Sequence, residues 1–370
     1  MPALSTLLKG NAAVGPSAQP KVCILGAGLV GCWIGAMIAA RGKAEVHFVG
    51  RQALLDRITT AGGLGVSCMD GRTHKIPLEG VNFHLAMPAD VVFDYIVLTT
   101  KRTGTKDALK ALTHLDTPAS RTVLVTLQNG VRQLEDVRDV LAHVVVVTGM
   151  FPFNVVQSDA TFCQSFPGKI VMDSTTAQGR AFIALLRASR VLVLAERNMQ
   201  AVLYAKLLAN LNNPISALSA MPLKAELEDQ GYRLIYVKML REALAVYKKA
   251  GISPKSLKGP SPHLAVRIYA LPDNYFAKLF PFMMKIDPKA TSSMYEDIKA
   301  NRQTEIEYLN GEIIRLAKSV NVSVPYNERV YKLVKLVELA KSSLVKHTPV
   351  QIEDYVQAHI ERQSSPEQQE

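Results

Sequence analysis

Three polar residues interrupt an apolar stretch in the second half of the chain. Lys206, Asn210 and Asn213 follow one another at spacings of four and three residues, which would place them on one stripe of a helix. A solvated polar face would give the same spacing, but the neighbouring leucines leave little surface to solvate. Partial burial lowers the pKa of a lysine and suits it to donate a proton. We therefore expect Lys206 to protonate the oxygen of a carbonyl group while hydride reaches the carbon.

A glycine pattern near the N-terminus has the spacing of a dinucleotide-binding turn. The segment Gly26-Ala27-Gly28-Leu29-Val30-Gly31 follows an expected strand and opens an expected helix. The first glycine permits a tight turn, the second lets the backbone approach a pyrophosphate, and the third lets helix and strand pack closely. A second expected strand follows at the right distance, so we favour a cofactor site over a chance glycine turn.

The end of that second strand distinguishes the two nicotinamide cofactors. An acid there would bond the ribose hydroxyls of NAD, whereas a base would meet the 2′-phosphate of NADP. The sequence has Gly50-Arg51 and no acid. Arg51 therefore predicts NADP(H), and the alternative is a solvated arginine that only opens the next helix.

Polar residues also follow the third and fourth expected strands. Lys101 ends the segment TTK, and Asn129 lies in the segment QNG. Residues just beyond the carboxyl ends of strands face the ligand crevice of an open α/β sheet. Lys101 and Asn129 are thus expected where nicotinamide and substrate meet, although each alone would fit an ordinary turn.

A later block contains SSMYED at residues 292–297 and TEIEYLNG at residues 304–311. By spacing alone it predicts a Ser-Ser turn that caps a short helix, followed by a second helix with surface acids.

Taken together, the motifs described above resemble the ketopantoate reductase (2-dehydropantoate 2-reductase) family from residue 21 to about residue 339. The resemblance lies in GAGLVG, TTK, QNG, KLLAN continuing into Asn-Pro, and SSM..D joined to TEIEYLNG, all in the order of the family.

The resemblance implies roles for individual residues. Lys206 is similar to the catalytic lysine, which protonates the 2-keto oxygen, and Glu305 to the acid that engages the substrate hydroxyl and that lysine. Asn129, Asn210 and Ser293 resemble substrate-binding positions, with Ser293 bonding the carboxylate. Arg51 and Lys101 resemble cofactor contacts.

The chain departs from the best-known bacterial pattern of the family at two places. The spacing from Lys206 to the Asn-Pro pair is one residue shorter, so Asn213 would reach the substrate from a shifted position. Leu223 follows Pro222 where an asparagine is expected.

The resemblance implies NADPH-dependent reduction of 2-dehydropantoate to (R)-pantoate for pantothenate biosynthesis. The departures keep open a related reductase of another branched 2-keto acid, and a non-enzymatic NADPH-binding regulator is a further alternative.

Short apolar runs alternate with helical stretches over the first half of the chain. Strands are expected at residues 21–25, 45–49, 95–99, 122–126 and 143–147, with a glycine-rich hairpin at 64–76. This alternation implies a mainly parallel sheet covered on both faces. Helical periodicity dominates after residue 196, apart from a Pro/Gly/Ser-rich loop at 253–272. The predicted fold class is an α/β Rossmann-type parallel-sheet domain followed by an all-α domain.

These patterns divide the chain into four predicted segments. They are a flexible extension (1–20), an NADP-binding Rossmann domain (21–194), a helical substrate and catalytic domain (195–361) and a disordered tail (362–370). The glycines inside the uncharged stretch Val22–Ala40 favour a strand and helix of a soluble protein over a membrane span. The extension lacks the arginines of a transit peptide, so we expect a cytoplasmic protein, with mitochondrial import as the weaker alternative.

Charge and cysteine content narrow the possible partners. The net charge of +11 fits nucleic acid, a membrane surface or a phosphorylated cofactor. Because the basic residues are spread along the chain, we expect neither nucleic acid nor membrane binding. The resemblance to the family implies a small 2-keto acid as substrate. Cys23, Cys32, Cys68 and Cys163 form no CxxC pair, which predicts a reducing compartment and no metal. A monomer or homodimer is expected.

Overall fold

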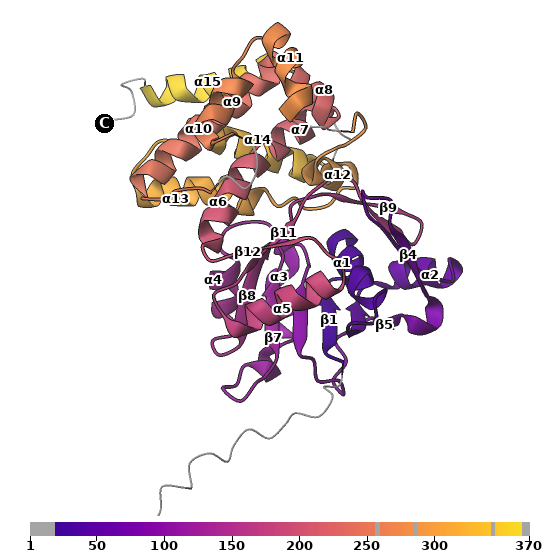
Figure 1. The fold of residues 1–370 in the computed structure, drawn as a ribbon. Coiled ribbons are helices and arrows are strands. Elements are labelled where there is room, and N and C mark those ends of the chain that lie inside the picture. Colours follow the sequence, from indigo (N-terminus) through magenta and orange to yellow (C-terminus); the bar gives the residue numbers. More distant parts are fainter. Residues whose placement is uncertain (1–18, 256–259, 284–286, 342–344, 365–370) are drawn as a thin grey trace, which may run out of the picture.

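An eight-stranded sheet forms the centre of the first half of the chain, in the order β12-β11-β8-β7-β6-β1-β2-β5 (Figure 1). The computed structural model describes residues 19–255, 260–283, 287–341 and 345–364. Neighbouring strands of this sheet are parallel except β8 and β11, which are antiparallel. Its strands are β1 (Lys21–Leu25), β2 (Glu45–Val49), β5 (Asn82–His84), β6 (Tyr95–Leu98), β7 (Val123–Thr126), β8 (Val145–Met150), β11 (Ile170–Asp173) and β12 (Val193–Glu196).

Helices cover both faces of this sheet, which explains why its central strands β1, β6 and β7 are largely apolar. Alternate residues of β1 point to opposite faces: Ile24 packs in the core under α1 and α5, and Cys23 in the core under α3 and α4. The helical segments of this half are α1 (Leu29–Ala39), α2 (Gln52–Thr60), η1 (Leu78–Gly80), η2 (Arg102–Gly104), α3 (Thr105–Lys110), η3 (Thr113–Leu115), α4 (Gln133–Arg138) and α5 (Ala177–Ala188).

A second sheet of four strands, in the order β4-β3-β10-β9, lies beside α1. Its strands are β3 (Gly63–Ser67), β4 (Thr73–Pro77), β9 (Val155–Ser158) and β10 (Thr161–Gln164). The antiparallel pair of β3 and β4 is the predicted hairpin, whereas β9 and β10 were not expected from the sequence. Trp33 of α1 donates to the carbonyl of Ser67 at 3.0 Å, which fixes the second sheet against the first.

The second half of the chain is helical, and its helices pack round the long helix α9. The core there includes the α9 residues Tyr236, Met239 and Ala243. The helical segments are α6 (Met199–Asn210), α7 (Asn213–Ser219), α8 (Leu223–Glu228), α9 (Gln230–Lys249), α10 (Pro262–Tyr269), α11 (Asp273–Met283), α12 (Ser293–Lys299), η4 (Ile306–Tyr308), α13 (Asn310–Ser319), α14 (Pro325–Ala340) and α15 (Pro349–Ser364). The predicted fold class is confirmed: a parallel-dominated α/β half precedes an all-α half.

Several predicted boundaries differ from the structure. Strand β12 runs to Glu196 and so crosses the predicted domain boundary at 194. The prediction of a loop at 253–272 is wrong for its second part, because Ser261 caps α10 by accepting from the Leu264 N–H and Pro262 fits the first turn. Helix α15 extends to Ser364, into the predicted tail. The predicted extension lies, up to residue 18, outside the described residues, as does the tail from residue 365.

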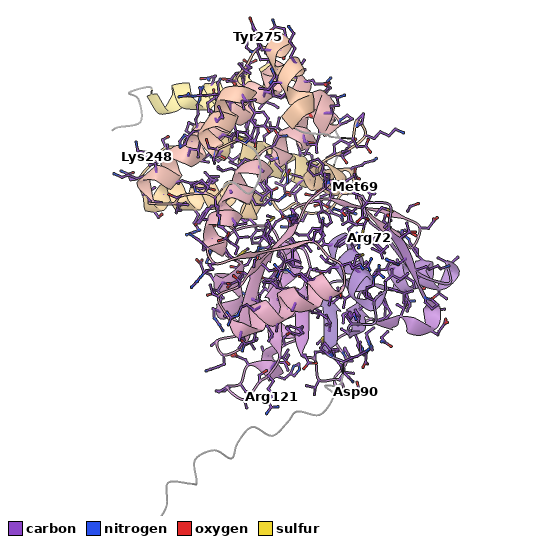
Figure 2. The ribbon with its side chains drawn as sticks, viewed as in Figure 1. Met69, Arg72, Asp90, Arg121, Lys248 and Tyr275 are labelled. Carbon is purple, nitrogen blue, oxygen red and sulfur yellow. The ribbon has the colours of Figure 1, made fainter. Side chains whose placement is uncertain are left out.

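The uncharged stretch at residues 22–40 divides into β1 and α1. Among the helices of the described ranges, none is long and apolar enough to cross a bilayer. The basic side chains Arg72, Arg121 and Lys248 lie in separate parts of the molecule (Figure 2).

Candidate active site

The glycine turn between β1 and α1 is held closely by its neighbours. Gly26 has a φ of +100°, and a Cβ there would lie 2.5 Å from the Thr100 nitrogen. A Cβ on Gly31 would lie 2.5 Å from the Gly26 carbonyl oxygen, whereas one on Gly28 would meet only that oxygen, at 3.9 Å. Gly26 and Gly31 are therefore required by packing, and open space remains beside Gly28. That space adjoins the N–H groups that begin α1 at Leu29, which are suited to an anion.

Arg51 lies just beyond the carboxyl end of β2 and precedes the first residue of α2. Its side chain is exposed. Among the described residues, the guanidinium has neither a hydrogen bond nor an ion pair. This position and this unpaired charge suit contact with an external phosphate group.

Lys101 follows β6 and pairs with Asp297 of α12. The Asp297 side chain is only 3% exposed, and Arg302 also donates to it, at 3.0 Å. Two cations thus compensate one buried carboxylate. The predicted cofactor residue Lys101 is therefore engaged in a link between the two halves of the molecule.

Glu305 connects three parts of the candidate site. Its Oε1 atom accepts from the Arg102 backbone N–H at 2.9 Å, and its Oε2 atom accepts from Asn129 Nδ2 at 2.9 Å. Asn129 Oδ1 in turn accepts from Asn210 Nδ2 at 3.5 Å. The structure thus brings together three predicted site residues from a loop before η4, the carboxyl end of β7 and the last residue of α6.

Lys206 lies one turn before Asn210 on α6 and is partly buried. The helix is anchored at its start, where Asn198 accepts from the Ala201 N–H at 3.1 Å. Burial lowers the pKa of Lys206. Within the described part of the chain its amine has no hydrogen bond or ion pair, so it is free to approach a ligand. The expected contact between Glu305 and Lys206 is not made, because the Glu305 oxygens are bonded to Arg102 and Asn129.

The predicted single stripe of Lys206, Asn210 and Asn213 is wrong in one respect. Helix α6 ends at Asn210, and Asn213 begins the separate helix α7. Pro214 has no N–H to donate to the carbonyl four residues earlier, which explains the interruption. Asn213 instead meets α12, where Ser292 Oγ donates to its carbonyl at 3.3 Å.

Ser293 is the exposed first residue of α12. Ser292 supplies the cap, since its Oγ accepts from the Tyr295 N–H at 3.1 Å. The predicted Ser-Ser turn is thus present. Because Ser292 does the capping, the Ser293 hydroxyl is left without an intramolecular partner among the described residues.

Arg102 belongs to the site but was not singled out from the sequence. It is 2% exposed, pairs with Asp136 and lies 4.7 Å from the ring centroid of Tyr308. Burial lowers its pKa. A charged residue immediately after Lys101 at a strand end was the available signal. Asp297 was also missed, although it stands in the SSM..D block.

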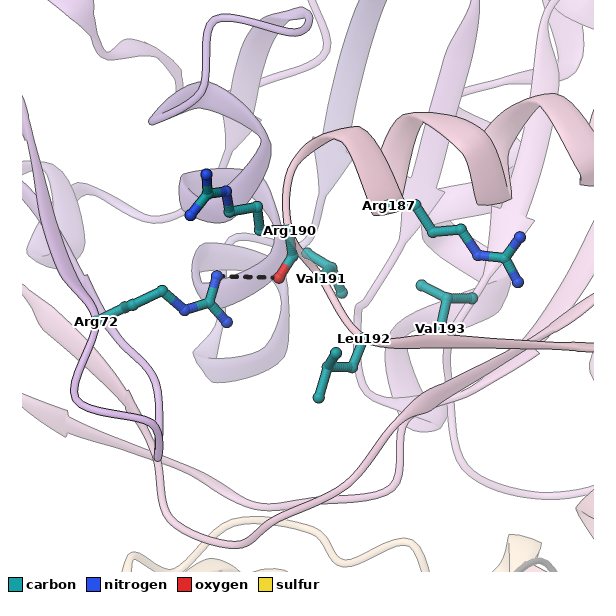
Figure 3. Close-up of a pocket in the computed structure, with 6 residues that line it drawn as sticks. All are labelled: Arg72, Arg187, Arg190, Val191, Leu192 and Val193. Atoms are coloured by element: carbon teal, nitrogen blue, oxygen red, sulfur yellow. Dashed lines mark hydrogen bonds between the residues drawn. The ribbon is translucent and has the colours of Figure 1, made fainter.

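A surface hollow of about 390 Å³ lies elsewhere, beside the hairpin of β3 and β4 (Figure 3). Arg72 donates there to the Arg190 carbonyl at 3.1 Å. Arg187 and three aliphatic residues complete the lining. None of the predicted site residues lines this hollow, so it is separate from the candidate site. In the described ranges no group of three or more His, Cys, Asp or Glu side chains is arranged to hold a metal ion.

Comparison with protein families gives two matches that together span most of the chain. The family described as ketopantoate reductase PanE/ApbA matches residues 22–176. Its counterpart for the C-terminal part, ketopantoate reductase PanE/ApbA C terminal, matches residues 198–338. The segment between the two matches, residues 177–197, contains α5 and β12.

Individual relatives give the same result. The chain is 26% identical to the 2-dehydropantoate 2-reductase of Pyrococcus horikoshii over 86% of its own length and 97% of that protein. It is 25% identical to the 2-dehydropantoate 2-reductase of Aquifex aeolicus, with the same shares covered, 86% and 97%.

Solved structures show the same architecture. A PanE/ApbA family ketopantoate reductase from Ralstonia eutropha is 26% identical, with a TM-score of 0.71, and covers 87% of this chain and 99% of its own. A D-mandelate dehydrogenase solved with NADH has a TM-score of 0.71 at 19% identity, covering 87% and 99%, and shares the fold.

Proposed function

Because the chain belongs to the ketopantoate reductase family, a family of nicotinamide-dependent oxidoreductases, we propose that it reduces 2-dehydropantoate to (R)-pantoate with NADPH, the step that serves pantothenate biosynthesis. The observation that carries this proposal is the unpaired, partly buried Lys206 amine. It lies one turn from Asn210, which is linked through Asn129 to Glu305. A proton donor and substrate-binding amides thus adjoin the ends of strands that follow a dinucleotide-binding turn.

The cofactor in this proposal is NADP(H). The space beside Gly28 and the start of α1 would accept the pyrophosphate. The unpaired guanidinium of Arg51 would bond the 2′-phosphate, which NAD lacks. The bound cofactor supplies a hydride to C2 of the keto acid. Lys101 contributes positive charge near the same edge while it is paired with Asp297.

The protein residues supply position and one proton. Lys206 donates its proton to the 2-keto oxygen as negative charge develops there, and its lowered pKa eases that transfer. Glu305 accepts from Asn129 and so orients the Asn129 amide towards Asn210. The exposed Ser293 hydroxyl would bond the substrate carboxylate. Asn213 would contribute from the start of α7, which the preceding residue, Ser292, contacts.

Reduction of another branched 2-keto acid is the second candidate, and Leu223 favours it. The Leu223 N–H donates to the Ala290 carbonyl at 2.8 Å, which places the start of α8 against the segment that leads to Ser293. An apolar side chain there suits a substrate without the hydroxyl group of 2-dehydropantoate.

A substrate panel separates the two candidates. We expect kcat/KM with NADPH to be higher for 2-dehydropantoate than for 2-keto acids that lack the hydroxyl. The reverse order in the wild-type protein, removed by Leu223→Asn, would establish the second candidate instead. Binding of NADPH without turnover of any 2-keto acid would favour a regulator and contradict both.

A further inference from the structure

A buried carboxyl group lies against the turn that separates α6 from α7. Glu226 of α8 is 0% exposed, and Asn212, inside that turn, is 6% exposed. Glu226 Oε2 accepts from Asn212 Nδ2 at 2.8 Å. The contact joins α8 to the side chain of Asn212, which lies between the two candidate site residues Asn210 and Asn213.

Two oxygen atoms of this pair of side chains have no hydrogen-bond partner among the described residues. They are Glu226 Oε1 and Asn212 Oδ1, and both are buried. Both are acceptors if Glu226 is ionised, and buried acceptors without a donor are costly. A single proton on Glu226 Oε1 would let this oxygen donate to Asn212 Oδ1, because a neutral carboxylic acid and an amide can exchange two hydrogen bonds.

The charges around Glu226 do not favour its ionised form. Arg233 is fully buried nearby, but its guanidinium is bonded to Asp273 and to the carbonyls of Leu227 and Leu271, each at 2.8 Å. Asp229, at the start of α9, adds negative charge. Burial is the main cause that raises the pKa of Glu226 to about 8; Asn212 and Arg233 act in the opposite direction. The other titratable groups facing Glu226 are the phenols of Tyr232, Tyr236 and Tyr269.

We propose that Glu226 is a positioning residue that acts as a neutral acid: it holds Asn212 by two hydrogen bonds and thereby sets the turn that presents Asn210 and Asn213 to the keto acid. The contacts of Asn210 and Asn213 depend on the position of that turn. Asn210 Nδ2 donates to Asn129 Oδ1 at 3.5 Å, and the Asn213 carbonyl accepts from Ser292 Oγ at 3.3 Å. The identity of the keto acid rests on the proposed function. The hydrogen-bonded pair of neutral Glu226 and Asn212 does not depend on it.

The first test is the pH dependence of KM for 2-dehydropantoate in Glu226→Gln. A glutamine amide can donate and accept like the neutral acid, without titrating. We expect wild-type KM to rise about tenfold between about pH 7 and about pH 9, the effect of losing one hydrogen bond. KM of Glu226→Gln should change less than about twofold over that range. A KM that rises equally in both proteins would overturn the proposal.

Ser216→Ala is the matched control. Ser216, four residues after Asn212 on α7, carries another buried hydroxyl without a partner among the described residues, and it could donate to Asn212 in place of the acid. We expect Ser216→Ala to keep the wild-type pH profile of KM. A profile flattened by Ser216→Ala and unchanged by Glu226→Gln would contradict the role of Glu226.

The second test does not require turnover. A difference infrared spectrum of wild type minus Glu226→Gln at about pH 7 should contain the carbonyl stretch of a protonated carboxylic acid. The Glu226→Leu and Asn212→Leu double variant should fold better than Glu226→Leu alone, because it leaves no unpaired amide. Carboxylate bands in place of the acid band would overturn the proposal, even if 2-dehydropantoate proved not to be the substrate.

Discussion

Lys206 is the proton donor of the proposed reaction, and its surroundings predict a pH dependence. Burial lowers its pKa, and no described anion compensates the charge. A proton donor must be protonated, so kcat for keto acid reduction should fall as pH rises through this lowered pKa, below the ordinary lysine value of 10.5. The measurement is kcat at saturating substrate across pH, in the Glu226→Gln background. A kcat that stays constant up to the ordinary lysine range would show that Lys206 is not the donor.

Arg51 should control the choice of cofactor. Removing its unpaired guanidinium in Arg51→Ala should raise KM for NADPH about tenfold to a hundredfold, because a phosphate loses its charged partner. KM for NADH should change little, since NADH has no 2′-phosphate. Arg57→Ala, an exposed arginine of α2, is the matched control. Equal effects of Arg51→Ala on both cofactors would contradict NADP(H) as the preferred cofactor.

At this scale the sequence proposes candidate site residues but does not predict the contacts that they make. The types and order of Lys206, Asn129 and Glu305 were sufficient to propose a site. The bond between Asn129 and Glu305 joins residues 176 positions apart, and the pair of Lys101 and Asp297 spans 196. Such pairings follow from how the two halves of the molecule meet, and local spacing contains no information on that.

The turn between β1 and α1 gives a prediction for an element. Gly31→Ala should destabilise the fold by about 1 to 3 kcal/mol, because its Cβ would overlap the Gly26 oxygen and Thr99. Gly28→Ala should stay folded, since its Cβ has room, yet bind NADPH at least about tenfold more weakly. Thermal unfolding and fluorescence titration with NADPH measure the two effects. Full NADPH affinity in Gly28→Ala would contradict the cofactor site.

Local signals account for the elements that were predicted and for those that were missed. The continuous apolar runs of β1, β6 and β7 identify central parallel strands. Strands such as β9 (VVQS) and β12 (VLAE) mix apolar and polar residues, and tertiary pairing rather than pattern defines them. The break between α6 and α7 and the start of α10 both lie at prolines, where knowledge of the cap was needed to decide between a loop and a helix.

The stability of the whole molecule should depend on pH through Glu226. Because its pKa is raised to about 8, the folded protein keeps a proton that the unfolded chain releases above the ordinary value of 4.5. Its stabilising contribution is complete below pH 4.5 and is lost as pH rises to about 8, a change of about 5 kcal/mol. Denaturant unfolding of wild type and Glu226→Gln should therefore differ in this pH window. Parallel pH profiles would show that Glu226 ionises normally.

The overall architecture was predictable because it follows from alternation along the chain. Strand-helix alternation implied the parallel sheet, and its loss after residue 196 implied the helical half. The antiparallel pairing of β8 with β11 and the presence of the second sheet could not be read from that pattern. The links of Asp297 to Lys101 and of Glu305 to Asn129 show that the candidate site includes residues from both halves of the chain.

The most direct test of the account is NADPH oxidation, followed by absorbance, with 2-dehydropantoate and three proteins: wild type, Lys206→Ala and the exposed control Lys248→Ala. The account predicts turnover by wild type and Lys248→Ala, and a loss of about 10² to 10⁴ in kcat for Lys206→Ala with NADPH affinity retained. Equal turnover by wild type and Lys206→Ala, or no turnover by a wild-type protein that binds NADPH, would contradict it.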